Sequence, residues 1–166
     1  MAAKSPASLS VTLPSDREIV LSRQFAAPRE LVFEAMSQPQ HLAHWYDPYG
    51  NSLALCEIDL RPGGAWRIVH RDPEGHEFGF RGQVREIVPP ECMVRTFEFE
   101  GLPGHVSVET LVLTDLGDGR TQMTVTARFD SVEDRDGMLQ SGMEDGAAAS
   151  YDRLALYLEQ LATHSV

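Results

Sequence analysis

The sequence predicts an α+β fold in which one antiparallel sheet packs against a long C-terminal helix. Near the C-terminus, Ala147, Tyr151, Leu154, Leu158 and Leu161 recur with alternating gaps of four and three, so they share one face of a helix. Most segments before this helix alternate apolar and polar residues, which is typical of strands with one covered face. The face of that sheet is therefore the expected partner of the helix.

The N-terminal region divides into a tail and a first strand. Residues 1–14 are rich in Ser, Pro and Ala and show no periodicity, so we expect a mobile tail before a single domain over residues 15–166. From Arg17 to Phe25 the chain has the pattern of a strand, with Ile19 and Leu21 on one side together with Phe25.

Two short helices are expected after this strand. Pro28 suits the first turn of a helix, and apolar positions between residues 31 and 36 give that helix a buried face. Pro39 ends it, and residues 40–45 can form a second, shorter helix.

Six further strands are expected between residues 53 and 129, separated by turns that contain Gly, Pro and Asp. Their expected ranges are 53–60, 65–71, 76–88, 92–100, 106–116 and 121–129. The segment 131–141 is then expected to form a separate turn or short helix, and its Met-bearing stretch between glycines could act as a flexible cover over a pocket.

The inward faces of these strands are rich in aromatic rings, and so is the approach to the last helix. If the helix leaves a hollow above the sheet, these side chains are its expected lining; the alternative is that they fill a solid core. The candidate ligand-binding residues are Trp45, Tyr46, Trp66, Ile68, His70, Phe78, Phe80, Arg95, Phe97, Phe99, Met138, Met143 and Tyr151.

His70 and Arg95 are the polar members of this set. An inward arginine is costly unless it is paired, so Arg95 either forms a salt bridge, with Glu57, Glu86 or Glu109, or reaches solvent at a strand end. The functional alternative is that His70 and Arg95 orient a carboxylate, phenol or carbonyl group of a ligand. An enzyme would need His70 as a general acid or base.

His41 and His44 form an HxxH pair on the expected second helix, with Asp47 nearby. This spacing can ligate zinc, but no third ligand has convincing spacing, so we expect a capping or surface role and no metal.

Charge and motif content narrow the function classes. A formal net charge of −11 disfavours a nucleic acid or an anionic membrane surface as partner. No apolar run approaches the ~20 residues that cross a bilayer, and no leader-peptide pattern opens the chain, so we expect a cytoplasmic protein without membrane insertion. Walker, GxGxxG, GxSxG and HExxH motifs are missing from the sequence, and no cofactor is expected.

Several motifs together resemble the START-like (helix-grip) superfamily. They are Ala27-Pro28-Arg29-Glu30, Trp45, Asp59-Leu-Arg-Pro-Gly-Gly64-Ala-Trp66, Gly82-Gln-Val-Arg-Glu-Ile-Val-Pro-Pro-Glu91 and Gly142-Met-Glu-Asp-Gly146. Within the superfamily the chain is similar to the branch related to the C-terminal domain of the activator of heat-shock-protein-90 ATPase. The resemblance runs from about Arg17 to Leu161. It implies a curved antiparallel sheet in the order strand, two helices, six strands and helix, with a cavity under the C-terminal helix.

Superfamily members include lipid carriers, hormone receptors, polyketide cyclases and co-chaperone domains, so the resemblance leaves three hypotheses. The first is a non-enzymatic carrier or sensor that binds a small apolar or amphipathic molecule. The second is an enzyme of the cyclase or aromatase kind that uses His70, Arg95 or a tyrosine in the same pocket. The third is a chaperone-interacting module that works through its surface, including the acidic segment 130–145. A homodimer is compatible with all three.

Overall fold

A computed structural model describes residues 7–46 and 51–164, and this part of the chain forms one eight-stranded antiparallel sheet and four helices. The elements in chain order are β1 (Ser10–Thr12), β2 (Glu18–Phe25), α1 (Arg29–Ser37), α2 (Pro39–Leu42), β3 (Ser52–Ile58), β4 (Ala65–Arg71), β5 (Glu77–Val88), β6 (Cys92–Phe99), β7 (Val106–Gly117), β8 (Arg120–Arg128), α3 (Val132–Gln140) and α4 (Met143–His164). The strand order across the sheet is β1-β2-β8-β7-β6-β5-β4-β3. The predicted α+β class is confirmed.

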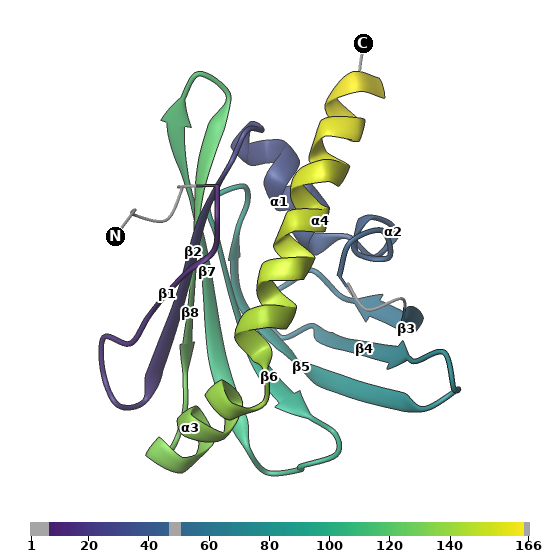
Figure 1. Cartoon of the computed structure of the whole chain (residues 1–166), viewed down its shortest axis with the longest axis vertical. Helices are drawn as coiled ribbons and strands as arrows, with labels where there is room; N and C mark the ends of the chain where they lie inside the picture. The colour runs from purple at the N-terminus through teal and green to yellow at the C-terminus, as the bar shows by residue number, and fades with distance from the viewer. Residues whose placement is uncertain (1–6, 47–50, 165–166) are drawn as a thin grey trace.

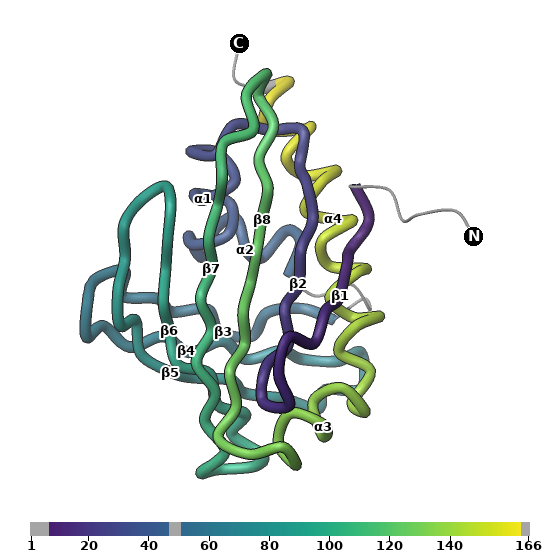
Figure 2. The backbone as a smooth tube through the Cα atoms, turned by 90° about the vertical axis from the view of Figure 1, so that its left-hand side faces the viewer, coloured from purple at the N-terminus to yellow at the C-terminus, as the bar shows by residue number. Residues whose placement is uncertain are grey.

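The sheet curves around α4, which crosses its inner face (Figure 1). Figure 2, turned by a quarter, shows the outer side of β1, β2, β7 and β8 with the helices behind them. The strand register shifts between Leu53 and Leu55, between Val84 and Glu86, and between Asp115 and Gly117. Such irregularities bend a strand and increase its twist, and here they let one continuous sheet close partly around a helix.

The C-terminal half of α4 anchors this helix in the core. Leu154 and Leu158 are almost fully buried, and Tyr151 and Ala147 pack against the same apolar cluster, as the spacing predicted. Asp152 accepts a hydrogen bond from the buried Arg23 of β2 at 2.8 Å. The helix is therefore fixed to the sheet by apolar packing at one end and by a charged contact to β2. Within the described residues no helix is both long and apolar enough to cross a membrane.

The N-terminal region differs from its prediction. Ser10–Thr12 pairs with β2 as strand β1, and Leu9 is buried against the core. A three-residue strand is too short to produce a period that can be recognised in a sequence. Residues 7–14 are thus part of the fold and do not form a free tail, while residues 1–6 lie outside the described part.

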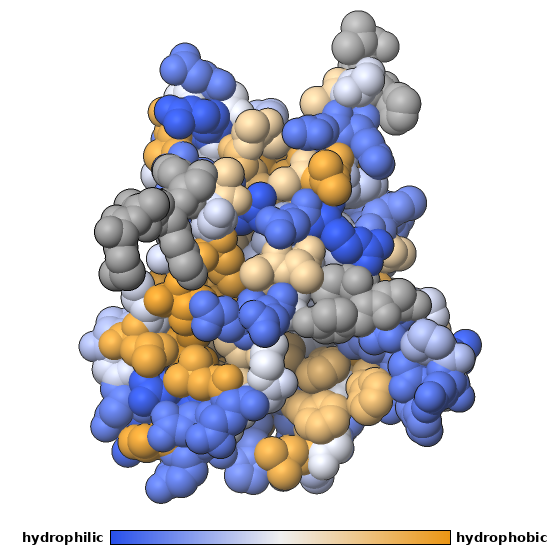
Figure 3. Space-filling view, in the orientation of Figure 1, coloured by the Kyte–Doolittle hydropathy of each residue, from blue (hydrophilic) through white to orange (hydrophobic). Residues whose placement is uncertain are grey.

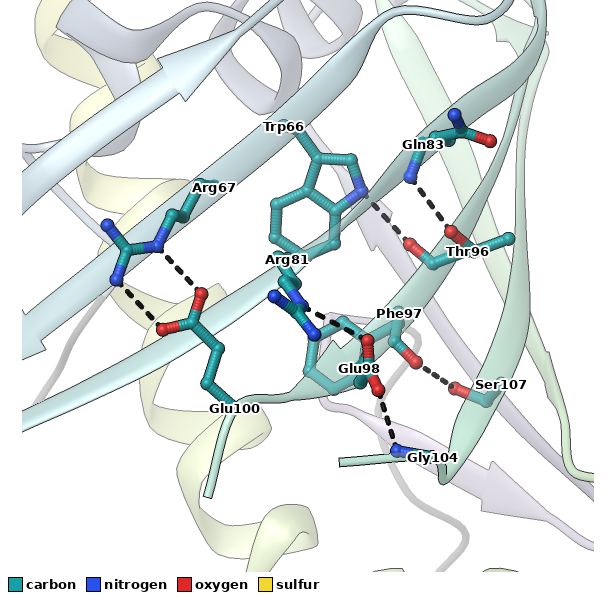
Figure 4. A network of polar contacts seen from close by, with 10 residues as sticks. All are labelled: Trp66, Arg67, Arg81, Gln83, Thr96, Phe97, Glu98, Glu100, Gly104 and Ser107. Atoms are coloured by element: carbon teal, nitrogen blue, oxygen red, sulfur yellow. Dashed lines mark hydrogen bonds and ion pairs between the residues drawn. The ribbon is translucent and has the colours of Figure 1, made fainter. Parts of the chain in front are cut away.

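Trp66 fixes the spacing of β4, β5 and β6 (Figure 4). Its indole Nε1 donates to the Thr96 carbonyl at 3.0 Å, passing over Gly82 of β5. A Cβ atom at Gly82 would lie 2.0 Å from the Thr96 carbonyl oxygen and 2.6 Å from that Nε1. Residue 82 must therefore be glycine for the tryptophan to reach its acceptor. On the opposite face of these strands, Arg67 pairs with Glu100 and Arg81 with Glu98.

We predict that Gly82→Ala lowers the free energy of unfolding by about 2–4 kcal/mol, because the added methyl group overpacks this point and breaks the indole hydrogen bond. Chemical denaturation measures the loss. Gly137→Ala is the matched control, since a Cβ there meets nothing within 4 Å and the residue lies in α3. The control should be neutral or stabilising by up to about 1 kcal/mol. Equal effects of the two substitutions would contradict the packing argument.

Candidate functional site

A cavity of about 720 Å³ lies between the inner face of the sheet and the N-terminal half of α4. This volume is within the range of about 300–1,000 Å³ found for small-molecule sites. Most of the predicted ligand-binding residues line it. They are Trp45, Tyr46, His70, Phe78, Phe80, Phe97, Phe99, Met138, Met143 and Tyr151. These side chains come from β4, β5, β6, α3, α4 and the segment after α2, so the cavity is assembled from most of the chain.

The structure places Trp66, Ile68 and Arg95 elsewhere. Trp66 is buried with its indole bonded to Thr96, while Ile68 and Arg95 line a smaller pocket of about 110 Å³. Alternation along a strand correctly put these residues on the inner face, but it does not show how deep a position lies. None of the three lines the large cavity.

Stacked rings make one wall continuous. The His70 ring stacks on Tyr46 with centroids 5.4 Å apart and meets Phe80 edge-on at 5.5 Å. Phe80 in turn lies 5.3 Å from Phe97 and 5.2 Å from Phe99. Ring pairs at these separations attract each other, so this wall is preformed and presents ring faces and edges to a guest.

Arg95 is held in a partly buried ion pair at the inner end of the site. Its Nε donates to Glu109 Oε1 at 2.9 Å across the β6–β7 register, and its guanidinium lies 4.2 Å from the centre of the Trp66 ring. The pKa of Arg95 is raised: burial by itself would lower it, but the charge of Glu109 and the contact with Tyr46 outweigh burial. Of the three partners considered for this arginine, Glu109 is the one it has.

Two tyrosines share this polar region. Burial raises the pKa of the Tyr46 hydroxyl, and the nearby Arg95 opposes part of the rise. Burial likewise raises the pKa of Tyr151, and the charge of Glu109 adds to it. Both phenols therefore stay neutral and protonated at physiological pH, in which form each can donate and accept a hydrogen bond.

Helix α3 lies at the mouth of the cavity. Ser131 caps it by accepting a hydrogen bond from the Asp134 amide at 3.1 Å, and His105 Nδ1 lies 2.7 Å from the Asp134 carboxylate. Phe78 and Leu102, which also line the cavity, are 41% and 54% exposed. Figure 3 shows apolar atoms on this part of the surface, beside α3 and the ends of β5 and β6. The predicted short helix over 131–141 is confirmed.

Sequence reasoning missed part of the wall. Glu109, His105 and Asp134 line the cavity, as do apolar residues of β2 and β8 such as Ile19 and Val125. The apolar ones were recognisable as inward residues, and only the extent of the hollow was unknown. His105 and Asp134 lie in a turn and in a short helix, where no periodicity indicates direction.

The HxxH pair serves the packing of α4. His41 Nδ1 lies 2.6 Å from the Tyr157 hydroxyl, and the His44 ring stacks on Tyr157 with centroids 4.9 Å apart. Among the described residues no group of three His, Cys, Asp or Glu side chains could hold a metal ion. Asp47, the other candidate ligand, lies outside the described part of the chain.

A curved antiparallel sheet around a C-terminal helix, with a cavity between them, defines a helix-grip domain of the START-like kind. Residues 26–159 match the model of the family described as "Activator of Hsp90 ATPase homolog 1-like protein". The chain belongs to this family. The comparison with curated proteins found no match.

Solved structures from several bacteria share the fold. A protein of Rhodobacter sphaeroides superposes with a TM-score of 0.87 at 25% identity, covering 92% of this chain and 99% of its own. One from Nitrosomonas europaea has a TM-score of 0.81 at 25% identity, with coverages of 91% and 99%. One from Chromobacterium violaceum has a TM-score of 0.70 at 28% identity, with coverages of 87% and 99%.

We predict that the buried phenols make the fold sensitive to alkali. The folded state holds the Tyr151 proton more tightly than the unfolded chain, so stability is fully present below the ordinary tyrosine pKa of 10.0 and is lost as pH rises above it. Each such phenol contributes up to about 1.4 kcal/mol per pH unit to this loss. Tyr151→Phe should reduce the dependence measured by denaturation above pH 10.0, with Tyr46 retaining its own share. An unchanged dependence in the variant would show that the phenol is not buried as described.

Proposed function

We propose that the protein binds a small hydrophobic or amphipathic molecule in the cavity under α4, as a carrier or sensor. The observation that carries the proposal is the cavity itself, about 720 Å³ in volume and lined mainly by aromatic and other apolar side chains. A space of this size is costly to leave between packed layers, since each missing contact weakens the core. A guest of suitable shape recovers those contacts.

The polar groups of the site favour binding over turnover. Arg95 is already engaged by Glu109, and Tyr46 and Tyr151 are held in their neutral forms. Such groups orient a ligand by hydrogen bonds, whereas a general base must accept a proton near the working pH. A ligand of about 20 non-hydrogen atoms at roughly 0.3 kcal/mol per atom would bind with a dissociation constant of about tens of micromolar.

Native mass spectrometry of the purified protein is the direct test. We expect a stoichiometric extra mass that is released when the protein is denatured, or that appears when an apolar probe is added. N-phenyl-1-naphthylamine serves as the probe, because its fluorescence rises when it leaves water. No added mass with either the purified protein or the probe would count against the proposal.

We predict that Ala147→Trp abolishes probe binding while the fold is kept. Ala147 lies on α4 and lines the cavity, so an indole at this position occupies the space that a ligand would take. The expected loss is about tenfold or more in affinity, measured by probe fluorescence and confirmed by thermal melting of the variant.

Leu156→Trp is the matched control, because Leu156 lies on the same helix and is 60% exposed. It adds an indole to α4 outside the cavity and should leave probe affinity unchanged. If the Ala147→Trp variant bound the probe with the same affinity as the wild-type protein does, the probe would have to bind outside the cavity.

A second function, docking to an Hsp90-type chaperone, is favoured by the family to which the chain belongs. The two functions separate cleanly. Docking should tolerate Ala147→Trp and should weaken on charge reversal of exposed acidic residues of the segment 130–145 that do not line the cavity, such as Asp130. The cyclase-like hypothesis stays a prediction, under which His70→Ala would lower turnover and leave binding intact.

A further inference from the structure

We infer that the cavity selects uncharged aromatic molecules that carry a hydrogen-bond donor, and that it rejects anions such as fatty acids and aromatic carboxylates. This inference rests on the proposed function and specifies its ligand class. It follows from the distribution of charge around the cavity.

The ionisable wall groups other than histidine and tyrosine are all acidic. Glu109 lies at the inner end, and Glu133 and Asp134 lie at the mouth. Among residues 7–46 and 51–164, no lysine or arginine side chain lines this cavity. An anionic ligand would therefore pass two carboxylates on entry and meet a third inside, without a cation of the wall to receive it.

Arg95 does not supply the missing cation. It lines only the smaller pocket, its Nε is bonded to Glu109, and its guanidinium is stacked on Trp66. The carboxylate of Glu109, by contrast, borders both spaces. The large cavity is therefore bordered by the negative partner, Glu109, and not by Arg95. For a ligand at a distance, the opposite charges of this pair largely cancel.

The N-terminal end of α4 also borders the cavity, through Met143 and Gly146. The positive end of a helix dipole attracts anions. Here the first turn carries Glu144 and Asp145, whose charges oppose that attraction. The helix end is therefore not an anion site.

Burial disfavours a negative charge on the two phenols of the wall, although Arg95 opposes part of this effect at Tyr46. Burial raises the pKa of Tyr46, and burial together with the charge of Glu109 raises the pKa of Tyr151. A ligand carboxylate placed between the same residues would lose its hydration under the same conditions. The desolvation cost that keeps the two phenols protonated therefore also applies to a ligand carboxylate.

The inner end of the cavity offers acceptors for a donor group. A carboxylate has about four lone-pair positions, so Glu109 can accept from a ligand while it holds Arg95. The neutral hydroxyl of Tyr151 can also accept a hydrogen bond, whereas that of Tyr46 already interacts with Arg95. A hydroxyl or secondary amine on an aromatic ring system suits this end, with the rings lying along Phe80 and Phe97.

The test compares two probes with the same rings. N-phenyl-1-naphthylamine is uncharged, and 1-anilinonaphthalene-8-sulfonate is the same molecule with an added sulfonate. Titrations at about 0.15 M salt screen the distant surface charges, because the Debye length is then about 8 Å. We expect the uncharged probe to bind at least about tenfold more tightly. Displacement of the bound uncharged probe by 1-naphthalenemethanol and by 1-naphthoate, which are nearly equal in size, separates charge from bulk.

Each outcome has a defined meaning. Preference for the uncharged member of both pairs supports the inference. Equal or tighter binding of the anions, abolished by Ala147→Trp, overturns the inference and leaves the proposed function standing. Failure of all four molecules to bind counts against the proposed function, and the inference falls with it.

Charge variants locate the selectivity. Glu109→Gln leaves Arg95 without its counter-charge, so affinity for the anionic probe should rise at least about tenfold relative to the uncharged one. Asp118→Asn removes one negative charge from the exposed β7–β8 turn and should change neither affinity. If Glu109→Gln does not fold, Glu133→Gln at the mouth gives the same direction with a smaller change. A folded variant that lacks one of these carboxylates is compared directly with the wild-type protein. If both prefer the uncharged probe to the same extent, the wall carboxylates do not determine the selectivity.

Discussion

The cavity depends on a gradient of side-chain size along α4. Toward its C-terminal end the helix presents Leu154 and Leu158, which fill the space to the sheet. Toward its N-terminal end the corresponding positions are Gly146, Ala147 and Ser150, and these line the hollow. These small side chains leave a space that Met143 and Tyr151, which also line the hollow from α4, do not fill. The rest of the site follows from this mismatch.

The aromatic wall and the ion pair are two consequences of leaving that gap open. Rings that lose contact with the helix keep their packing by stacking on one another, as His70, Phe80 and Phe97 do. Arg95 bridges the crowded part of the sheet below them, held by Glu109 and Trp66. Removing one partner of such a pair is destabilising, since the remaining charge is left partly buried and unpaired. Polarity at the base of the cavity is therefore fixed by the fold and does not depend on a ligand.

The fold and much of the wall could be predicted because both depend on periodicity. Alternation put Trp66, His70, Phe80 and Phe97 on the inner face, and helical spacing gave the face of α4 that contains Leu154. Periodicity could not predict how deeply each inward side chain is buried. Trp66 and Phe78 occupy equivalent inward positions, yet one is sealed over Gly82 while the other is 41% exposed at the mouth. Alternation along a strand records the side of the sheet on which a residue lies, but it does not record what covers that residue.

Helix α3, at the mouth, is the least buried of the helices and strands that line the cavity. Helix α3 contains no buried residue. It is held by packing of Met138 and Leu139 against the core and by polar contacts such as that of Arg135 with the Ser15 carbonyl. Elements with few buried apolar contacts open at a smaller free-energy cost than the core. We infer that a guest enters beside α3 while the ion pair and the C-terminal half of α4 stay in place. Glu133 and Asp134, the acidic groups at the mouth, belong to this helix.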